Sequence, residues 1–460
     1  MSELVVVANR GPATINVAPD GSLTVGTGAG GLAPSLARAL DGRDSTFVAA
    51  AMSEGERRAA REGLPEAIAG CDLSLVEVEE ALHRAAYGVV SNQLLWYLHH
   101  GLFDLPRRPL LDHHFAAAFE AYREFNRLFA EAAAAHADEG ATVVVHDYHL
   151  CLVGAFLRRS RPDLKTAHFS HTPFATPEEL EVLPEVVRAE LLDGLSSFGA
   201  CGFHTERWRE RFARSAAGRA AAESFVAPLG TDALSFGHLA ESEEVLARGR
   251  LLDELVDGRQ LLLRSDRVEL SKNLLRGFLA YEELLAERPQ LRGGVVFVAR
   301  LYASRTDLAD YLAYRAETEQ LAARINERFG NAGWSPVVVQ IADDFPATVA
   351  AFRRYDVLLV NPVRDGMNLV AKEGPVVNGR DGVLVLSRQA GAFEELGADA
   401  LAVNPFDVSG TARALGEALA MPAAERAPRA ARLAAASAAL PPGPWHDVVI
   451  GHARRATAGG

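Results

Sequence analysis

The sequence is poor in cysteine, in long apolar runs and in net positive charge, and each shortage argues against a class of protein. Its three cysteines, Cys71, Cys151 and Cys201, are too few and too widely spaced for a disulfide framework or a zinc cluster. No apolar run reaches membrane length, and the N-terminus lacks a basic start followed by a long apolar core. A net charge of −13 argues against a surface that binds nucleic acid. We therefore expect a cytoplasmic protein with neither a membrane nor a nucleic acid as partner.

At 460 residues the chain is too long for one typical core, so two domains are expected. Short buried runs alternate with helical stretches in both halves, which predicts an α/β protein with two Rossmann-like parallel-sheet domains facing a central cleft. We place the first domain at residues 1–232 and the second at 233–443, with a last helix at about 444–460 packing back on the first. The expected strands are Leu4–Ala8, Thr142–Val145, Thr166–Ser170 and Ser224–Gly230 in the first half, and Gln260–Leu263, Gly294–Ala299, Pro336–Gln340, Val357–Val360 and Gly382–Leu386 in the second.

The stretch Asp356–Glu373 carries the strongest local signal for a binding site. The strand Val357–Val360 is followed by a glycine turn at Asp365 and by helical spacing over Met367–Glu373. A strand–turn–helix corner places free backbone N–H groups at the carboxyl end of a sheet, where open α/β folds bind phosphates. Asp365 is placed to hold sugar hydroxyls, and Glu373, about two turns into the helix, to accept from a ribose. An ordinary corner with a surface aspartate is the alternative.

A glycine-rich segment follows the first strand. Gly26, Gly28 and Gly31 have the G-x-G-x-x-G spacing of a dinucleotide-binding loop, but that fingerprint must follow the strand directly, and here the hairpin Ala13–Val25 intervenes. We interpret the segment as a loop whose N–H groups approach a phosphate at a helix start, with a plain loop as the alternative. A nicotinamide-dependent oxidoreductase is a competing hypothesis, for which Glu54 stands roughly where the ribose-binding acid is required.

Polar residues also follow other predicted strands. His146–Leu150 and His171–Phe174 end two apolar strands of the first half, which makes them site candidates by position. Arg267 and Lys272 flank the turn after the first strand of the second half. Two fixed cations at a strand's carboxyl end suit a diphosphate, since arginine offers bidentate bonds and lysine a point charge. A solvated basic turn is the alternative.

Several motifs occur in one order along nearly the whole chain. They are NRGP with GGLA, SNQLLW, VHDYHL, SHTPFATP, DRVELSKN, the Ser304–Arg305 segment, RDGMNLVAKE and VNPFD. Together they resemble the trehalose-6-phosphate synthases, a retaining glycosyltransferase family (family 20) with the GT-B fold. The sequence departs from the family at Thr46–Met52, which lacks the usual tryptophan, and at its first turn, where the inserted hairpin makes the turn longer than in many relatives. Both departures concern the acceptor rather than the transfer chemistry.

The resemblance implies a role for each matching position. Gly31 would give its N–H to the donor phosphate, and His171 would bind the donor sugar near its 6-hydroxyl. The donor-binding positions would be Gly31, His171, Asp365, Gly366, Met367, Asn368, Leu369, Val370 and Glu373, with Arg267 and Lys272 on the diphosphate. The acceptor-binding positions would be Arg10, Tyr87, Trp96, Asp147 and Arg305.

The resemblance also implies transfer of glucose from a nucleoside-diphosphate glucose to the anomeric oxygen of glucose 6-phosphate, giving α,α-trehalose 6-phosphate. The partners would be these two substrates; homo-oligomerisation is left open. Neither a cofactor nor a metal is expected, because Arg267, Lys272 and the turn N–H groups can neutralise the leaving diphosphate. The alternative within the family is a pseudoglycosyltransferase that joins a nucleotide cyclitol to a cyclitol-amine phosphate. A sugar-nucleotide sensor without turnover is the non-enzyme hypothesis.

The donor base is predicted from one short segment. In this family the residues after the strand Pro336–Gln340 lie against the base, and here they include Asp343 and Asp344. A carboxylate can accept from both N1–H and N2–H of guanine, whereas the carbonyl oxygens of uracil would repel it. This favours GDP-glucose over UDP-glucose, with Asp343 or Asp344 as the reader. If both aspartates instead cap the helix that begins near Pro346, the base is undecided.

Overall fold

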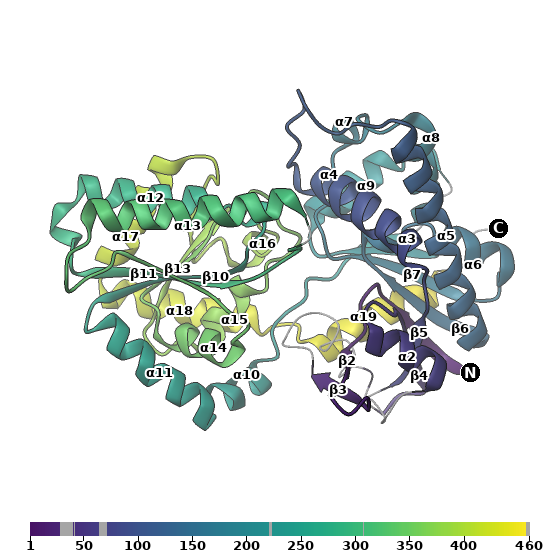
Figure 1. The fold of residues 1–460 in the computed structure, drawn as a ribbon, viewed down its shortest axis with the longest axis horizontal. Helices are drawn as coiled ribbons and strands as arrows, with labels where there is room; N and C mark the ends of the chain where they lie inside the picture. The colour runs from purple at the N-terminus through teal and green to yellow at the C-terminus, as the bar shows by residue number, and fades with distance from the viewer. Residues whose placement is uncertain (28–39, 41, 64–70, 220–222, 307, 457–460) are drawn as a thin grey trace. The chain divides into compact units, whose positions relative to one another are not determined.

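The computed structural model describes residues 1–27, 40, 42–63, 71–219, 223–306 and 308–456. The chain divides into two compact units: unit 1 is Met1–Leu229 with Pro442–Gly460, and unit 2 is Gly230–Pro441 (Figure 1). The first boundary lies ahead of the predicted residue 232. The reason is that the N–H groups of Gly230 and Thr231 donate to the carbonyl oxygens of Leu440 and Ser437, which ties them to unit 2.

Unit 1 contains a seven-stranded sheet in which neighbouring strands are parallel, in the order β5-β4-β1-β6-β7-β8-β9. Its strands are β1 Ser2–Val7, β4 Ser45–Ala50, β5 Asp72–Val76, β6 Ala137–His146, β7 Lys165–Ser170, β8 Ala200–Phe203 and β9 Glu223–Val226. The predicted inserted hairpin is confirmed: β2 (Ala13–Val17) pairs antiparallel with β3 (Leu23–Thr27). The central strands are apolar and buried on both faces, as parallel sheets require.

Helices cover the sheet of unit 1. They are α2 Glu54–Glu62, α3 Glu80–His83, η1 Arg84–Leu95, α4 Trp96–His100, α5 His113–His136, η2 Tyr148–Leu150, α6 Val153–Ser160, α7 Pro177–Leu180, α8 Glu185–Ser196, α9 Glu206–Ser215 and α19 Pro442–Arg455. Helix α5 packs on β1, β4, β5 and β6, and α19 packs on β6, β7 and β8. The fully buried Trp445 fixes α19, because its Nε1–H donates to the carbonyl oxygen of Ala227 at 2.9 Å. η1 is a π-helix of 12 residues.

Unit 2 contains a six-stranded parallel sheet in the order β12-β11-β10-β13-β14-β15. The strands are β10 Gln260–Arg267, β11 Val295–Tyr302, β12 Val337–Ile341, β13 Val357–Val360, β14 Val383–Ser387 and β15 Leu401–Val403. The helices are α10 Ala233–Ala240, α11 Glu243–Val256, η3 Leu270–Lys272, α12 Leu274–Glu287, η4 Pro289–Leu291, α13 Ala309–Phe329, α14 Phe345–Arg354, α15 Val370–Val377, α16 Phe393–Leu396, α17 Val408–Ala420 and α18 Ala423–Ser437. The predicted class, two parallel-sheet α/β domains, is confirmed.

Two apolar cores lie on opposite faces of the unit 2 sheet. On one face, alternate strand residues such as Leu262 and Phe297 pack with α12, α13 and α17. On the other, Leu263 and Val298 pack with α11, α14, α15 and α18, as Figure 1 shows. Because successive strand side chains point to opposite faces, one run of apolar residues builds both cores. Burial on both faces fixes the register of the strands and therefore the positions of their polar ends.

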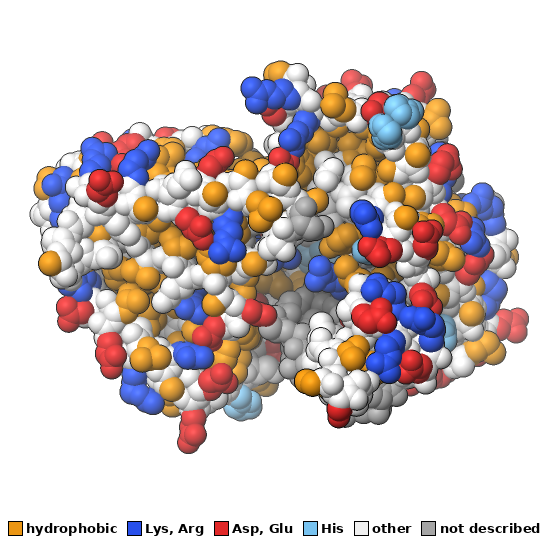
Figure 2. Space-filling model, in the orientation of Figure 1, with side chains coloured by type: hydrophobic (Ala, Val, Ile, Leu, Met, Phe, Trp, Pro, Cys, Tyr) orange, Lys and Arg blue, Asp and Glu red, His pale blue; other side chains and the backbone are white. Residues whose placement is uncertain are grey.

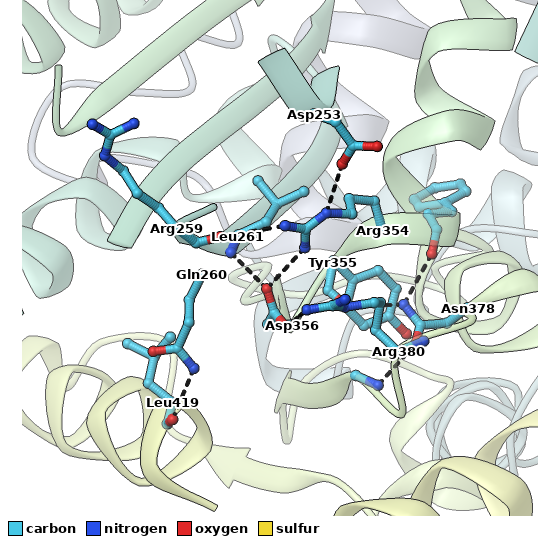
Figure 3. Close-up of polar contacts among 12 residues, drawn as sticks. Asp253, Arg259, Gln260, Leu261, Arg354, Tyr355, Asp356, Asn378, Arg380 and Leu419 are labelled. Atoms are coloured by element: carbon cyan, nitrogen blue, oxygen red, sulfur yellow. Dashed lines mark hydrogen bonds and ion pairs between the residues drawn. The ribbon is translucent and has the colours of Figure 1, made fainter. Parts of the chain in front are cut away.

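The amino-terminal edge of this sheet is closed by a polar network around the buried Asp356 (Figure 3). Its Oδ2 accepts from the Leu261 backbone N–H at 2.8 Å and pairs with Arg354 at 3.1 Å. Arg380 reaches Oδ1 at 3.5 Å, and Arg354 also pairs with Asp253 at 2.9 Å. A buried carboxylate is tolerated when it is paired and hydrogen-bonded in this way. The network joins the starts of β10 and β13 and leaves the opposite edge for chemistry.

The surface seen in Figure 2 carries Lys and Arg side chains interspersed with Asp and Glu side chains. On this face neither sign gathers into a large patch. Among the helices of the described residues, none is long and apolar enough to cross a membrane.

Candidate functional site

The carboxyl edge of the unit 2 sheet carries a lysine–aspartate pair from two of the predicted site motifs. Lys272 ends η3, directly after β10, and its Nζ lies 2.5 Å from Oδ2 of Asp365 in the turn after β13. The same Oδ2 accepts from Nδ2 of Asn368 at 3.0 Å. Burial alone would lower the pKa of Lys272, but the carboxylates of Asp365, Asp266 and Glu269 outweigh it and raise the pKa. The lysine is therefore a fixed cation at this edge.

Glu269 links two of the predicted cations, and sequence reasoning missed it. Its Oε1 lies 3.1 Å from Nε of Arg267 and 3.2 Å from NH1 of Arg305, and it accepts from the Ser304 hydroxyl at 2.8 Å. Burial would raise the pKa of Glu269, but the positive charges of Arg267, Arg305 and Lys272 lower it to about 2. The available signal was its place inside DRVELSKN, between the two predicted cations. The carboxylate orients both guanidinium groups while Arg267 keeps about half of its side chain exposed.

The turn after β13 differs from its prediction. Helical spacing suggested a helix from Met367, but α15 begins at Val370, because Asn368 has a φ of +74° and its side chain bonds Asp365 instead. Met367 is buried in the apolar core, which explains the misleading periodicity. Gly391 packs against this turn: a Cβ there would lie 1.8 Å from the Gly366 carbonyl oxygen, so only glycine fits. Gly366, Asn368 and Leu369 therefore form a turn that leads into the helix.

Glu373 lies in the first turn of α15 rather than two turns into a helix. Its side chain is half-buried, and burial raises its pKa to about 7. A carboxyl with this pKa is a mixture of acid and carboxylate at neutral pH. Hydroxyl donors that reach this carboxyl would increase the fraction of carboxylate, because hydrogen bonds to the charged form favour that form.

The two aspartates of the predicted base-reading segment have different surroundings. Asp344 is the N-cap of α14, which begins at Phe345: its Oδ1 accepts from the Ala347 N–H at 3.0 Å, and its Oδ2 pairs with Arg248 at 3.1 Å. Asp343 is exposed. The capping alternative therefore holds for Asp344, whose carboxylate is already engaged, and the carboxylate of Asp343 is the one presented to solvent.

In unit 1, three predicted acceptor residues come from separate segments. Arg10 follows β1, and its NH2 lies 3.4 Å from the Tyr87 hydroxyl. The Tyr87 ring stacks between His83, at 5.1 Å between centroids, and His149, at 5.5 Å. Trp96 begins α4, is buried, and stacks on His100 at 3.8 Å. The π-helix η1 carries Tyr87, and such helices are frequent at functional sites.

Buried histidines form a chain at the carboxyl ends of β6, β7 and β8. Nδ1 of His204 lies 3.4 Å from the Ala227 carbonyl oxygen, so it must donate there. Nε2 of His204 then accepts from Nδ1 of His171 at 3.1 Å, and Nε2 of His171 accepts from Nδ1 of His146 at 3.0 Å. Burial, and then the neighbouring rings, lower the pKa of His171 and His146 well below the ordinary value. The chain is neutral, and both ring nitrogens of His171 are engaged within it.

Asp147 joins this chain to the predicted acceptor site. Its Oδ1 accepts from the His171 backbone N–H at 3.2 Å, and burial raises its pKa to about 6. Its φ is +72°, and Arg305 and Asn368 also have positive φ, at +44° and +74°. A positive φ is strained for these residues and persists only when the surroundings impose it. Such strain concentrates at functional sites, and three predicted positions share it.

Two further expectations concern a phosphate-binding glycine and a metal. Gly31 lies outside the described residues. Among those residues, one group of metal-capable side chains gathers closely enough to hold an ion: Asp112, His113 and His114. All three are exposed, Asp112 caps α5 through the His114 and Phe115 N–H groups, and none is a predicted site residue.

Comparison with known proteins identifies the family of the chain. The model of glycosyltransferase family 20 matches residues 2–446. The chain is 34% identical over 444 residues to a bifunctional trehalose-6-phosphate synthase/phosphatase of Thermoproteus tenax, covering 91% of this chain and 59% of that protein. It is 34% identical over 448 residues to a trehalose-6-phosphate synthase of Klebsiella pneumoniae, covering 93% and 90%. The chain spans 59%, 47% and 54% of the length of three of the curated relatives it matches.

Solved structures share the fold over both units. An E. coli structure bound with UDP-2-fluoro glucose matches with a TM-score of 0.86 and 30% identity, covering 99% of each chain. A UDP-forming α,α-trehalose-phosphate synthase of Burkholderia xenovorans in complex with glucose-6-phosphate matches with a TM-score of 0.83 and 29% identity, covering 97% of this chain and 98% of that one. The predicted family and its GT-B fold are thereby confirmed. The names of these relatives give no support to the pseudoglycosyltransferase alternative.

Proposed function

Because the chain belongs to glycosyltransferase family 20, we propose that it transfers glucose, with retention, from a nucleoside-diphosphate glucose to glucose 6-phosphate. The product is α,α-trehalose 6-phosphate. The observation that carries the proposal is the charged edge of unit 2, where the Lys272–Asp365 pair stands beside the Arg267–Glu269–Arg305 cluster. Fixed cations at the carboxyl end of a parallel sheet suit a leaving diphosphate.

The site residues keep the roles that the family implies. Arg267 and Lys272 hold the diphosphate, the Gly366–Val370 turn and Gly31 offer N–H groups to the phosphate, Asp365 and His171 hold the glucose, and Glu373 accepts from the ribose. Because both ring nitrogens of His171 are bonded to other histidines and its backbone N–H donates to Asp147, its carbonyl oxygen is the part we assign to the donor sugar. Arg10, Tyr87, Trp96, Asp147 and Arg305 take the acceptor.

The transfer needs no carboxylate nucleophile. The anomeric oxygen of glucose 6-phosphate attacks the donor's anomeric carbon on the face that the diphosphate leaves. The bond from that carbon to the phosphate oxygen breaks, and the leaving oxygen takes the acceptor's proton. The protein supplies position and charge stabilisation. Since Arg267 and Lys272 already supply two positive charges, we expect chelators to leave the rate unchanged.

We further propose GDP-glucose as the preferred donor, with Asp343 as the reader of the base. Asp344 is occupied by its helix cap and Arg248, so only Asp343 presents a carboxylate that can accept from guanine N1–H and N2–H. Several similar proteins are named as UDP-forming or as bound to a UDP sugar, which makes UDP-glucose the second candidate. A repelled carbonyl or an unmet acceptor costs about 1–3 kcal/mol, or roughly tenfold or more in donor selection.

One assay tests both parts. Release of nucleoside diphosphate is measured with GDP-glucose and with UDP-glucose, each with glucose 6-phosphate, with glucose or with no acceptor. Release only with glucose 6-phosphate is expected; equal use of plain glucose would overturn the acceptor assignment. For the base, Asp343→Asn should reduce the preference for GDP-glucose, and Asp344→Asn, the matched control one residue away, should leave it unchanged. A clear wild-type preference for UDP-glucose would refute the guanine assignment.

A further inference from the structure

Arg300 is a buried cation that forms no ion pair with a carboxylate among the described residues. It lies on β11 opposite Gln340 of β12, and its side chain is 8% exposed. NH1 donates to Oε1 of Gln340 at 2.6 Å and NH2 to the Asp344 carbonyl oxygen at 3.3 Å, while Nε has no acceptor among the described residues. A guanidinium has five N–H donors, and the two hydrogen bonds above use two of them. The carboxylate of Asp344 pairs with Arg248 instead.

This arginine stands where the proposed base and ribose residues converge. Tyr302, two positions further along β11 and hence on the same face of the strand, bonds Thr348 of α14 at 2.5 Å. Burial raises the pKa of Tyr302, and the carboxylates of both Asp343 and Glu373 act in the same direction. Tyr302 therefore lies within electrostatic reach of the predicted base reader and of the predicted ribose residue. Arg300 contacts the start of the same helix through the Asp344 carbonyl oxygen.

We propose that Arg300 selects the donor by the oxygen on its base, donating a hydrogen bond to O6 of guanine or to O4 of uracil. The inference rests on the proposed function, because it requires a nucleoside-diphosphate donor. It holds for either of the two candidate donors. Adenine and cytosine carry an amino group at the equivalent position, and its N–H bonds would face the N–H bonds of the guanidinium. Arg300 thus separates keto bases from amino bases, and Asp343 separates guanine from uracil.

The competing explanation is that Arg300 only ties β11 to β12 and to the start of α14. Both of its observed contacts serve that purpose. If Arg300 had only this structural role, its replacement would change the dissociation constants of all nucleotides by the same factor. A base reader changes the ratio between keto and amino nucleotides and leaves the diphosphate contacts intact. The test therefore compares ratios of dissociation constants rather than absolute affinity.

Calorimetry on the full chain measures binding of GDP, IDP, ADP, UDP, CDP and inorganic pyrophosphate, with no turnover required. IDP and ADP are the closest pair, because they share a purine without a 2-amino group and differ only at the 6-position and in the proton on N1. The wild type should bind IDP over ADP, and UDP over CDP, by about tenfold to a hundredfold, the range for a hydrogen bond to a charged group. Arg300→Gln should lower both ratios by about tenfold or more, and Arg300→Lys should keep part of them.

Arg248→Gln is the matched control, because it removes the same charge beside Asp344 from an arginine that already has a partner; both ratios should stay as in the wild type. Pyrophosphate should bind equally to all four proteins. The inference is overturned if the wild type binds IDP and ADP equally, if Arg300→Gln keeps the ratios, or if that variant weakens pyrophosphate as much as GDP. Equal binding of IDP and ADP by the wild type overturns the inference even where Arg300→Gln does not fold. Keto selectivity without transfer to glucose 6-phosphate would refute the proposed function alone.

Discussion

The carboxyl edges of the two sheets are built from different chemistry. In unit 1 the edge is a chain of neutral, buried histidines bonded ring to ring, from His204 through His171 to His146. In unit 2 the edge is a set of ion pairs, in which Lys272 meets Asp365 and one oxygen of Glu269 meets two arginines. Neutral donors and acceptors suit sugar hydroxyls, whereas fixed charges suit a diphosphate. The same sheet architecture therefore carries two edges of different chemistry.

We expect the largest loss of activity when a cation is removed from the unit 2 edge. Arg267→Ala or Lys272→Ala should lower kcat/KM by about tenfold to a thousandfold, or about 1.4–4 kcal/mol of transition-state stabilisation, because the leaving diphosphate loses a charge partner. Steady-state kinetics with saturating glucose 6-phosphate measures it. Arg328→Ala removes an exposed arginine of α13 as the control and should have little effect. Full activity in either site variant would remove that residue from the site.

Acid should lower the stability of the histidine-rich edge of unit 1. His168 of β7 is also buried beside the histidine chain, with its Nε2 3.1 Å from the Asp147 carbonyl oxygen. Burial lowers the pKa of His168 to about 4, against 6.5 in the unfolded chain. Between these values the unfolded state binds more protons, so stability is present above pH 6.5 and is lost as pH falls towards 4. From pH 7 to pH 5 this one ring should cost unit 1 about 2 kcal/mol.

The measurement is urea unfolding at both pH values, with hydrogen–deuterium exchange to separate the strands of unit 1 from those of unit 2. His146 and His171 act in the same direction, so His168→Gln should reduce the acid loss without abolishing it. If the variant and the wild type lose equal stability between pH 7 and pH 5, the assignment of His168 as a buried neutral ring is wrong.

At Glu373, in unit 2, we expect a smaller effect, a dependence of donor kcat/KM on pH. Its pKa of about 7 means that the carboxylate, the form that accepts from a ribose, falls about tenfold in population between pH 8 and pH 6. Donor kcat/KM should fall by about the same factor, and Glu373→Gln should be less active and flat over this range. Asp147, with a pKa of about 6, adds a second limb at lower pH that the variant should keep. A wild-type profile that is flat from pH 8 to pH 6 would contradict the ribose role.

The sequence predicts those parts of the molecule that depend on short-range pattern. Buried runs such as Val357–Val360 became strands, because a strand covered on both faces has to be apolar throughout. The predicted start of α15, at Met367, was wrong. The Asp365–Asn368 hydrogen bond and the positive φ of Asn368 keep this segment out of the helix. Met367 continues the helical periodicity because it packs in the core. Local spacing carries no information about such a contact.

Residues that act through contacts between segments could not be predicted. One carboxylate oxygen of Glu269 pairs with Arg305, which lies on another loop. Gly391 packs closely against Gly366, which lies in the turn after a different strand. The direction of the histidine chain follows from one backbone carbonyl, that of Ala227. The different surroundings of Asp343 and Asp344 depend on where α14 begins, which is set to a single residue by Asp344 itself.

The return of α19 to unit 1 affects the order in which the molecule can be assembled. Trp445 completes the unit 1 core by bonding Ala227, 218 positions earlier in the chain. A ribosome adds about 5–20 residues per second, so the strands of unit 1 wait roughly 10–45 s for this tryptophan while all of unit 2 is being synthesised. Unit 2 is continuous in the chain and has no such delay. The unit that begins first in the sequence is therefore the one that is completed last.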